Sequence, residues 1–347
     1  MSEAPLKPSA LLVDAVRAIE VSRRRIAVVT DDEGRVLGTL TDGDVRRCLL
    51  AGGSLDTTLD KAMNPRPISA QVGSPDEYLL DLMRRGNVMA VPLVDRAGRF
   101  VRLIHVSDLA GADSIVRTDD VAFAVIMAGG DGLRLRPLTE GIPKAMVEIG
   151  GVPLLERQIQ RLARAGLKRI YISVHYLSHI IEDHIGDGSA FGLEVRYLRE
   201  QQKLGTAGAL SLLPERPASP IIVMNGDILT TVDFGSLHAY HQLHGALVTI
   251  AAVDYRIQIP YGVIHMEAPY VTALLEKPSQ RFLCNAGVYA VSPEALPLVP
   301  ESSHSNMTDL INTCLAAKHR VAVFPVHEYW SDIGTADDLD KARALFS

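Results

Sequence analysis

Hydrophobic positions in the first third of the chain follow the same order twice. In each copy, apolar residues at helical spacing are followed by two short strand-like runs, which a turn containing Asp and Gly separates. The segments of the first copy are residues 11–20, 26–30 and 36–40. Those of the second copy are residues 76–85, 90–94 and 100–104. A helix followed by a hairpin, present twice, predicts an internal repeat of one α+β unit.

Beyond residue 120, apolar runs alternate with longer amphipathic stretches. The predicted strands are residues 121–127, 169–174, 193–199 and 220–224. The predicted helices are residues 154–165, 178–185 and 206–213. Strands that alternate with helices predict an α/β, Rossmann-like domain, in which helices cover both faces of a mostly parallel central sheet. Small and acidic residues at 110–120 separate the two halves, so we predict domains at residues 1–118 and 119–347.

The composition narrows the class of partner. A chain of 347 residues, 47% of them hydrophobic, has enough apolar material for two cores. The formal net charge of −6 comes from interspersed acidic and basic residues, which favours small-molecule partners over nucleic acid or a membrane. The sequence shows no secretory signal, and no apolar run approaches the roughly 20 residues of a membrane-spanning helix. We therefore expect a cytoplasmic protein whose three widely separated cysteines are reduced and buried.

In each copy of the N-terminal repeat, the second strand-like run leads to a predicted helix start that carries an acidic residue. The first copy has Asp44, three positions after Thr41, and the second copy has Asp108. Unpaired amides at a helix start can hold a phosphate, and a carboxylate there can accept hydrogen bonds from a ribose. The alternative interpretation is that both aspartates only interact favourably with the helix dipole.

This pattern resembles a tandem pair of CBS domains, whose ligand motif is a glycine, two apolar residues, Thr or Ser, two variable residues and Asp. The first copy matches the motif with Gly38, Thr41 and Asp44, whereas the second has His105 at the threonine position. The resemblance implies an adenine nucleotide as a regulatory ligand of these three residues and of Asp108. It also implies a homo-oligomer, either a dimer or a larger assembly.

A glycine-rich segment follows the first predicted strand of the C-terminal half. It reads AGGDGLRLRPLT at residues 128–139, and PKAM follows at residues 143–146. Glycines allow backbone amides to approach phosphates, and Arg134 and Lys144 would neutralise a triphosphate and the pyrophosphate that leaves. A glycine-rich loop alone also fits a dinucleotide-binding domain or a tight turn, but the longer string is more specific.

The string resembles the signature of sugar-1-phosphate nucleotidyltransferases, GGxGTRLxPLT followed by PKPM. The chain departs from it at Leu133, where Thr is usual, and at Ala145, where the second Pro is usual. A glycosyltransferase, which also uses a nucleotide sugar, lacks this loop. The resemblance extends over residues 121–347 and implies that the loop binds the nucleotide. The residues implied are Ala128, Gly129, Gly130, Gly132, Arg134 and Lys144.

Later motifs of the same family appear in order. The string LGTAGA at residues 204–209 matches the loop beside the nucleoside base, although read alone it also fits a helix cap. The nucleotide-binding residues that it adds are Gly205, Thr206 and Ala207. Asp227 ends an apolar strand at the sheet edge where α/β folds bind ligands, and the resemblance pairs it with Asp332 as a metal ligand. Either aspartate alone would fit a turn, but together they suit Mg²⁺.

Three further matches imply a site for the sugar phosphate. Its residues are Tyr261, Gly262, Glu276, Lys277, Asn285 and Gly287. By resemblance, Lys277 attracts the phosphate of the sugar, while Glu276 and Asn285 bind its hydroxyl groups. On its own, the pair Glu276 and Lys277 would also fit a solvated surface ion pair.

The implied reaction is attack by a sugar 1-phosphate on the α-phosphorus of a nucleoside triphosphate, with release of pyrophosphate. The implied catalytic residues are Arg134, Lys144, Asp227 and Lys277, with Mg²⁺ as the cofactor. By resemblance the nucleotide is GTP, because the catalytic half lacks a β-helix extension, as do guanylyltransferases for mannose, heptose or hexosamine 1-phosphates. UTP and dTTP stay open as alternatives, since no residue identified here fixes the base. A non-catalytic nucleotide sensor of the same fold is a further alternative, against which the retained charged residues argue.

Overall fold

The computed structural model describes residues 4–22, 26–86, 88, 90–105, 108–109 and 121–346. The chain forms two compact units, Met1–Val116 and Arg117–Ser347. The boundary predicted after residue 118 lies at 110–120, outside the described residues. Among those described, no helix has both the length and the apolar character needed to cross a membrane. Cys48, Cys284 and Cys314 are free thiols, of which only Cys314 is fully buried.

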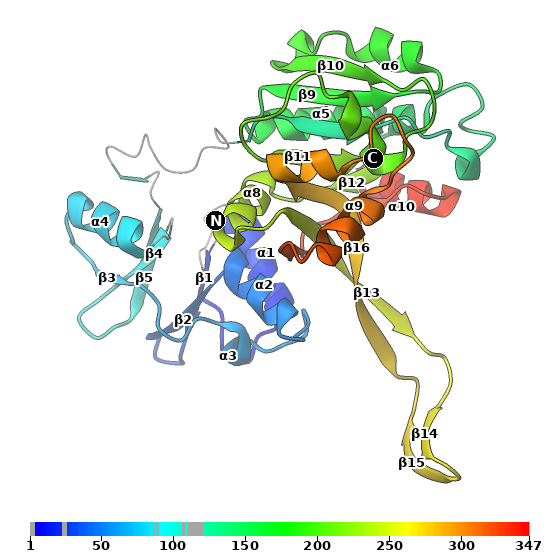
Figure 1. The fold of residues 1–347 in the computed structure, drawn as a ribbon. Coiled ribbons are helices and arrows are strands. Elements are labelled where there is room, and N and C mark those ends of the chain that lie inside the picture. Colours follow the sequence, from blue (N-terminus) through cyan, green and yellow to red (C-terminus); the bar gives the residue numbers. More distant parts are fainter. Residues whose placement is uncertain are drawn as a thin grey trace. The chain divides into compact units, whose positions relative to one another are not determined.

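The N-terminal unit contains the predicted repeat (Figure 1). The first copy consists of α1 (Leu12–Ser22), β1 (Ile26–Thr30), β2 (Val36–Thr41), α2 (Asp42–Leu50) and α3 (Leu59–Ala62). The second copy consists of β3 (Ala70–Gln71), α4 (Asp76–Gly86), β4 (Ala90–Val94) and β5 (Phe100–His105). In each copy an antiparallel hairpin follows the helix, β1 with β2 and β4 with β5. The helix boundaries agree with the hydrophobic pattern within two residues.

Both hairpins of this unit are buried on two faces, which explains why their first strands are continuously apolar. Ala27 and Val29 pack with α1 and α2, while Ile26 and Val28 face Ala90 and Leu103 of the other copy. Successive strand residues point to opposite faces, so each face has its own partners. The turns also exchange backbone hydrogen bonds, because the amide of Val36 donates to Gly98 O at 3.1 Å. The two copies therefore share a small apolar cluster, while each copy also has a cluster of its own.

The C-terminal unit is built on a seven-stranded sheet in the order β10-β9-β6-β11-β16-β13-β17. The strands are β6 (Ala124–Met127), β9 (Arg169–Val174), β10 (Glu194–Arg199), β11 (Ile221–Asn225), β13 (Val248–Gln258), β16 (Ser279–Val291) and β17 (Val321–Val326). Only β16 runs antiparallel to its neighbours β11 and β13 in this sheet. The remaining neighbours pair in parallel, which confirms the predicted mostly parallel α/β architecture.

Helices cover both faces of this sheet, as the apolar strands require. The α-helices are α5 (Leu154–Arg164), α6 (Ser178–Ile185), α7 (Gly205–Gly208), α8 (Phe234–His244), α9 (Met307–Ala316) and α10 (Ala336–Phe346). On one face, Ile126 of β6 packs in a cluster with α5, α6 and α8. On the other face, Val125 packs in a cluster with α7 and α9. Adjacent residues of one strand thus enter two separate cores.

Short elements connect the sheet to the loops around it. They are β7 (Glu148–Ile149), β8 (Val152–Pro153), β12 (Ile228–Thr230), β14 (Val263–Glu267), β15 (Tyr270–Leu275) and β18 (Trp330–Asp332). The helix predicted at residues 206–213 is shorter than expected: α7 continues as a 3-10 helix, Ala209–Leu212. Pro214 explains this end, because the residue before a proline disfavours the helical conformation, and Leu213 is extended.

Candidate functional site

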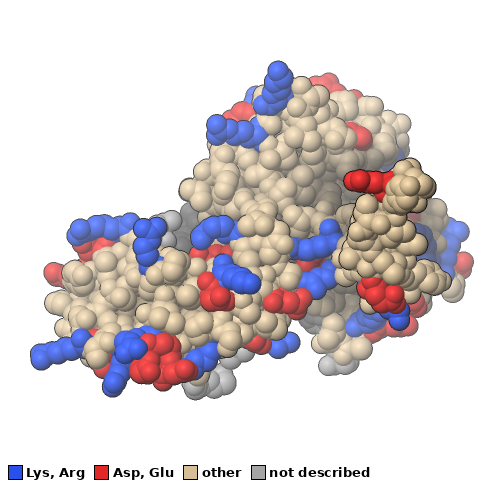
Figure 2. Space-filling model, turned by 90° about the horizontal axis from the view of Figure 1, so that it is seen from below, with Lys and Arg blue, Asp and Glu red and all other residues tan. Residues whose placement is uncertain are grey.

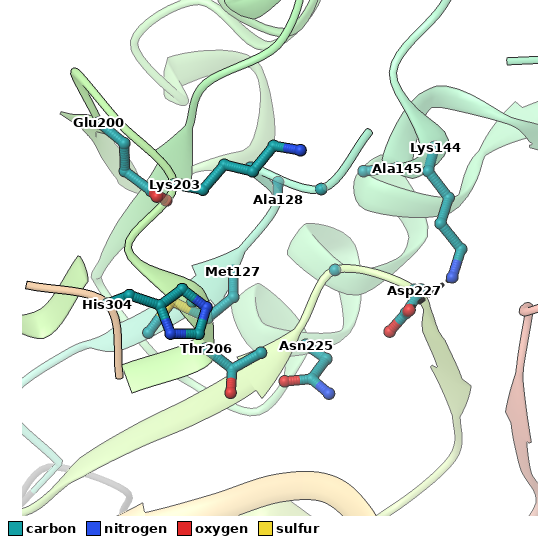
Figure 3. Close-up of a pocket in the computed structure, with 14 residues that line it drawn as sticks. Met127, Ala128, Lys144, Ala145, Glu200, Lys203, Thr206, Asn225, Asp227 and His304 are labelled. Carbon is teal, nitrogen blue, oxygen red and sulfur yellow. Dashed lines mark hydrogen bonds and ion pairs between the residues drawn. The ribbon is translucent and has the colours of Figure 1, made fainter. Parts of the chain in front are cut away.

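A pocket of about 230 Å³ opens where β6 and β11 end. The carboxyl ends of parallel strands are where open α/β sheets bind ligands. Figure 3 shows Glu200, Lys203 and His304 at one end of this pocket and Lys144 with Asp227 at the other. The lining residues are Met127, Ala128, Gly129, Gly130, Lys144, Ala145, Glu200, Lys203, Gly205, Thr206, Asn225, Gly226, Asp227 and His304. The pocket therefore combines most of the predicted glycine loop with one of the predicted acids.

The glycine loop lies against the segment that carries Lys144. Gly132 has φ 65°, and a Cβ atom there would lie 2.9 Å from the Cβ of Lys144. The hydroxyl of Thr139 donates to Gly132 O at 2.7 Å and closes the loop. Close approach and a left-handed backbone both require glycine at this position. Folding of the loop thus sets the direction in which Lys144 enters the pocket.

The two predicted metal ligands lie on neighbouring segments. Asp227 follows β11, and the amide of Ile333 donates to its carbonyl at 2.9 Å. Asp332 ends β18, which pairs with β12 through Ile228 and Asp332. Lys144 Nζ lies 2.5 Å from Asp227 Oδ2 and 3.9 Å from Asp332 Oδ1. The structure therefore brings a cation and both acids, which are far apart in the sequence, to one point.

The donor set at this point fits a divalent cation. Asp227 Oδ1 and Asp332 Oδ1 are both buried and accept no hydrogen bond from a described residue. Burial raises the pKa of Asp332, and the neighbouring charge of Asp227 raises it further, against the opposing effects of Lys144 and Arg134. Buried carboxylate oxygens without donors are the ligands that a hard cation needs. The single positive charge of Lys144 offsets only part of the negative charge of the two carboxylates.

Arg134 lies near the acids although it does not line the pocket. Its guanidinium is 3.6 Å from the Cβ position of Gly334, two residues after Asp332. The side chain itself is exposed, as is Leu133 at the position where the family has Thr. Ala145 at the second departure is buried and lines the pocket. Neither departure removes a charged group from the site.

The opposite end of the pocket is held by hydrogen bonds between two loops. The amides of Ala207 and Gly208 both donate to Ser305 O at 2.9 Å, and the amide of Ser305 donates to Leu204 O at 2.8 Å. The amide of Met307 donates to Thr206 Oγ1 at 3.0 Å. This ladder joins the start of α7 to the segment before α9. Ala207, a predicted nucleotide-binding residue, is fully buried in the core cluster with α9 and does not line the pocket.

Four pocket residues with polar or charged side chains were missed by the sequence analysis as site residues. They are Glu200, Lys203, Asn225 and His304. Glu200 accepts from the amide of Leu204 at 2.7 Å and from the hydroxyl of Ser173. Lys203 forms an ion pair with Asp131 of the glycine loop. Glu200 and Lys203 directly precede the LGTAGA string, which is a usable signal, whereas nothing in the sequence places His304 beside that string.

The predicted sugar-phosphate residues are divided between two places. Gly287 lies beside the pocket, since a Cβ atom there would be 2.8 Å from Asn225 Nδ2. Asn285 supports this turn by accepting from the amide of Gly287 at 3.0 Å. The other four predicted residues lie on or beside the hairpin of β14 and β15, which projects from the sheet in Figure 1. Those four are Tyr261, Gly262, Glu276 and Lys277.

The predicted regulatory aspartates of the N-terminal unit accept hydrogen bonds from their own chain. Asp44 is buried and accepts from the amide and the hydroxyl of Thr41 at 2.8 and 2.7 Å. Asp108 accepts in the same way from the amide of His105 at 2.9 Å. Gly38 allows a close crossing, because a Cβ atom would lie 2.8 Å from Asn64 O. The capping box of α2 explains Asp44 without a ligand, and nucleotide binding at either aspartate stays a prediction.

Comparison with known proteins agrees with this geometry. The family model "Nucleotidyl transferase" matches residues 123–346, which contain the whole pocket. The chain belongs to the nucleotidyl transferase family. A second family model, "CBS domain", matches residues 3–51 and 59–114 and identifies the N-terminal repeat as a tandem CBS pair.

Relatives of this nucleotidyl transferase include mannose-1-phosphate guanylyltransferases. The protein of that name from Mycobacterium tuberculosis is 31% identical over 229 residues, which cover 64% of this chain and 63% of the relative. The corresponding protein of Saccharomyces cerevisiae is 31% identical over 232 residues, 64% of each chain. The chain thus spans just under two thirds of the length of the curated relatives it matches.

A solved structure shares the fold of the C-terminal unit. HddC from Yersinia pseudotuberculosis is 26% identical with a TM-score of 0.52, and the match covers 65% of this chain and all of that protein. A second structure of HddC is a complex with GMP-PN and gives the same score, identity and coverage.

Proposed function

We propose that this protein transfers a nucleoside monophosphate, GMP from GTP, to a sugar 1-phosphate and releases pyrophosphate. The observation that carries the proposal is the convergence of Lys144, Asp227 and Asp332 beside a glycine loop at one sheet edge. A reaction between two polyanions needs cationic and metal-binding groups at one place, since mutual repulsion is its main obstacle. The names of the relatives, mannose-1-phosphate guanylyltransferases, support the substrate class.

In this reaction the protein mainly binds and orients. A sugar phosphate is already anionic at neutral pH, so its attacking oxygen needs no strong general base. Amides of Gly129 and Gly130 in the loop would approach the triphosphate, while Arg134 and Lys144 would neutralise it and the departing pyrophosphate. No covalent enzyme intermediate is required, because one phosphate oxygen displaces pyrophosphate directly.

Asp227 and Asp332 would hold Mg²⁺, as the two orphaned carboxylate oxygens suggest. When bound, the ion would offset the negative charge of the phosphates. Lys144 now contacts the same acids, so it would exchange part of its contact with Asp227 for contacts with phosphate oxygens. Both acids remain necessary in this arrangement, because each supplies one buried carboxylate oxygen that has no hydrogen-bond partner among the described residues.

Glu200 supports a preference for guanine. Its carboxylate lies at the pocket end opposite Lys144 and accepts hydrogen bonds only (Figure 3). Guanine presents a ring N–H beside an exocyclic amine, whereas uracil and thymine present one N–H between two carbonyl groups. A carboxylate attracts the first edge and repels the carbonyls of the second. UTP and dTTP are therefore the weaker candidates.

A pyrophosphate-release assay tests the proposal directly. GTP, UTP, dTTP, CTP and ATP would each be combined with a panel of hexose, heptose and hexosamine 1-phosphates. We expect the highest kcat/KM with GTP, and we expect Asp227→Ala to lower pyrophosphate release at least about a hundredfold. Asp340→Ala, which removes an exposed acid on α10, is the matched control and should turn over normally.

Lys277→Ala should cause a loss of the same order, at least about a hundredfold, because it removes the cation assigned to the acceptor phosphate. Normal turnover of either variant would show that the role of that residue is misassigned. Release of pyrophosphate with none of the triphosphates would refute the enzymatic proposal and leave a nucleotide-sensing protein.

A further inference from the structure

The buried face of α5 carries one polar side chain among hydrophobic ones. Its buried residues are Leu154, Leu155, Gln158, Ile159 and Leu162. Leu155, Ile159 and Leu162 belong to the core cluster on one face of the sheet, whereas Gln158 is polar and only 4% exposed. A buried amide costs free energy unless it forms hydrogen bonds, so the contacts of this side chain indicate its role.

The side-chain nitrogen of Gln158 donates to two backbone carbonyl groups. It donates to Asn225 O at 3.0 Å and to Ile228 O at 2.7 Å. These two bonds use both donors of the amide group. The opposite orientation of the amide would place its oxygen against the same two carbonyl oxygens, which would repel it. Gln158 therefore joins the middle of α5 to both ends of the turn between β11 and β12.

That turn carries Asp227, one of the two candidate metal ligands. Asp227 lies between the two carbonyl groups that Gln158 contacts, and Figure 3 shows the side chains of Asn225 and Asp227 on the same turn. Ile228, at the far end of the turn, lies opposite Asp332 in the ladder of β12 and β18. The glutamine thus contacts the backbone on both sides of one acid and directly opposite the other.

Two further contacts hold the turn, both between backbone groups. The amide of Gly226 donates to Met127 O at 2.8 Å, and the amide of Ile333 donates to Asp227 O at 2.9 Å. A Cβ atom at Gly226 would lie 2.7 Å from Met127 O, so the turn also packs tightly against β6. The turn is therefore anchored to β6, to the segment after β18 and, through Gln158, to α5.

The side-chain oxygen of Gln158 is buried but accepts no hydrogen bond from a described residue. Met224, Ile228 and Phe234 are among the residues that line a small cavity beside the glutamine, so a hydrophobic side chain of the same length would suit this space. Such a side chain would also avoid the cost of an unpaired acceptor. The two hydrogen bonds to the turn are therefore what glutamine contributes here and a hydrophobic residue would not.

The two acids at the turn need this support because their carboxylates repel each other. On the face of the molecule that Figure 2 shows, acidic and basic side chains are interspersed. At the turn, by contrast, Asp227 and Asp332 approach one amine, Lys144 Nζ, at 2.5 and 3.9 Å. The charge of Asp227 contributes to the raised pKa of Asp332, which reflects this repulsion. A cation can bind both carboxylates only if the backbone holds them together.

We propose that Gln158 is a positioning residue, which holds the turn between β11 and β12 so that Asp227 and Asp332 can bind one divalent cation. This inference rests on the proposed function, because that function assigns both acids to Mg²⁺. Gln158 does not line the pocket, so it acts through the turn and not on the substrates. Removal of a group that orients metal ligands commonly lowers metal affinity about ten- to a hundredfold. We therefore expect the loss of Gln158 to weaken metal binding.

Gln158→Met tests the proposal, because it removes both donors and keeps the length of the side chain. Mg²⁺ binding would be followed without turnover, as the rise in melting temperature during a titration with MgCl₂. We expect the Mg²⁺ concentration at the half-maximal rise to increase at least about tenfold. Gln160→Met is the matched control. It removes a side-chain hydrogen bond to Glu156 on the same helix and should leave that concentration unchanged.

Pyrophosphate release provides a second readout. At the Mg²⁺ concentration that half-saturates the wild type, the turnover of Gln158→Met should be low, and saturating MgCl₂ should bring it close to the wild-type value. Saturating MgCl₂ should not restore Asp227→Ala, because that variant lacks a ligand. Rescue by the metal thus separates a misplaced ligand from a general loss of structure, which added Mg²⁺ would not repair.

Equal Mg²⁺ midpoints for Gln158→Met and Gln160→Met would overturn the proposal, since Gln158 would then contribute to stability alone. The proposed function would still stand if Asp227→Ala were inactive in the same assay, whereas full activity of Asp227→Ala would refute the metal site itself. If Gln158→Met does not fold, Gln158→Asn tests the same point, because its shorter side chain cannot reach both carbonyl groups. A wild-type Mg²⁺ midpoint in that variant would equally overturn the proposal.

Discussion

The folded protein disfavours the ionised form of Asp332. The proposed reaction nevertheless requires that form. Burial and the charge of Asp227 raise the pKa of Asp332, so the ionised carboxylate costs stability at neutral pH, and this cost decreases as the pH falls from the raised pKa towards the ordinary value of 3.8. Functional sites often combine charges in this way. The carboxylate is accordingly expected to lower the stability of the metal-free protein while serving the reaction.

Asp332→Asn should therefore raise the melting temperature of the metal-free protein while it abolishes pyrophosphate release. Addition of Mg²⁺ should stabilise the wild type more than the variant, because only the wild type keeps both ligands. Thermal unfolding in EDTA and in MgCl₂ measures both effects, with Asp340→Asn as the control. A lower melting temperature of Asp332→Asn in EDTA would contradict the account of its raised pKa.

His241 is a buried histidine on α8 with a purely structural set of contacts. Its Nδ1 lies 2.8 Å from Thr249 Oγ1, and its Nε2 lies 2.9 Å from Ser292 Oγ. Burial lowers its pKa from 6.5 to about 4. A folded pKa below the unfolded value means that the unfolded chain binds the proton first. The stability contributed by neutral His241 is therefore present above pH 6.5 and is lost as the pH falls from there towards about 4.

His241→Gln should flatten the pH dependence of the unfolding free energy between pH 7 and pH 5. One such proton contributes a slope of at most about 1.4 kcal/mol per pH unit. Urea unfolding at several pH values measures the slope, and His244→Gln, which changes an exposed histidine of the same helix, should keep the wild-type slope. If both variants keep that slope, His241 is not the group that titrates.

At the scale of single residues, the sequence identified candidate ligand-binding residues more readily than residues required by close packing. Asp227 could be identified because it ends an apolar strand, and Gly132 because glycines allow the amides of a phosphate loop to approach the ligand. The role of Gly38 was less accessible. A glycine in a ligand motif and a glycine beneath a crossing segment look alike until Asn64 is seen above it.

At the scale of secondary-structure elements, the conformation of the loop at the start of α7 depends on contacts with the segment before α9. Gly205 has φ 77°, and a Cβ atom there would lie 2.7 Å from Ser305 O, the acceptor of the amides of Ala207 and Gly208. Any side chain at this position would push the segment before α9 away. That segment carries His304, which lines the pocket.

Gly205→Ala should therefore raise the KM for the nucleoside triphosphate at least about tenfold and lower the melting temperature, while Gly192→Ala should lower stability only. Gly192 has a similar φ of 74° but nothing within 4 Å of its Cβ position, so it reports backbone strain alone, roughly 1 kcal/mol. Steady-state kinetics and thermal unfolding of both variants separate strain from collision. An unchanged KM in Gly205→Ala would show that the nucleotide does not use this loop.

Helices and strands whose hydrophobic residues recur at a regular spacing could be predicted from the sequence. Strands that are defined by hydrogen bonding to a distant segment could not. The strands 26–30, 90–94 and 169–174 and the helix 178–185 match their predicted limits. By contrast, the sequence analysis identified neither β13 nor β16. The outer half of β13 alternates tyrosine and isoleucine with charged or polar residues, and that of β16 shows no regular alternation, so both resemble a surface loop. Only the register between the two strands identifies them.

At the scale of the whole molecule, the two units have separate cores. The clusters of the CBS pair contain only residues 6–109, and those of the nucleotidyl transferase unit contain only residues 121–342. Internal duplication and strand–helix alternation predicted both architectures, because each depends on local periodicity. The order of the seven strands could not be predicted in the same way, since β16 enters the middle of the sheet from far along the chain.

Removal of residues 1–116 should consequently leave a folded catalytic unit. Its clusters remain complete, and its pocket lies wholly between Met127 and His304. We expect a cooperative thermal transition and a turnover within about threefold of the full chain when no adenine nucleotide is present.

If the CBS pair regulates the enzyme, AMP or ATP changes the kinetics of the full chain and has no effect on residues 117–347. An effect that persists in the shortened protein would place the adenine nucleotide at the catalytic pocket, and Asp44→Asn in the full chain provides the independent check. That change keeps the size of the side chain but removes the charge that the amide and hydroxyl of Thr41 now hold, so it should abolish the response to the nucleotide while basal turnover continues.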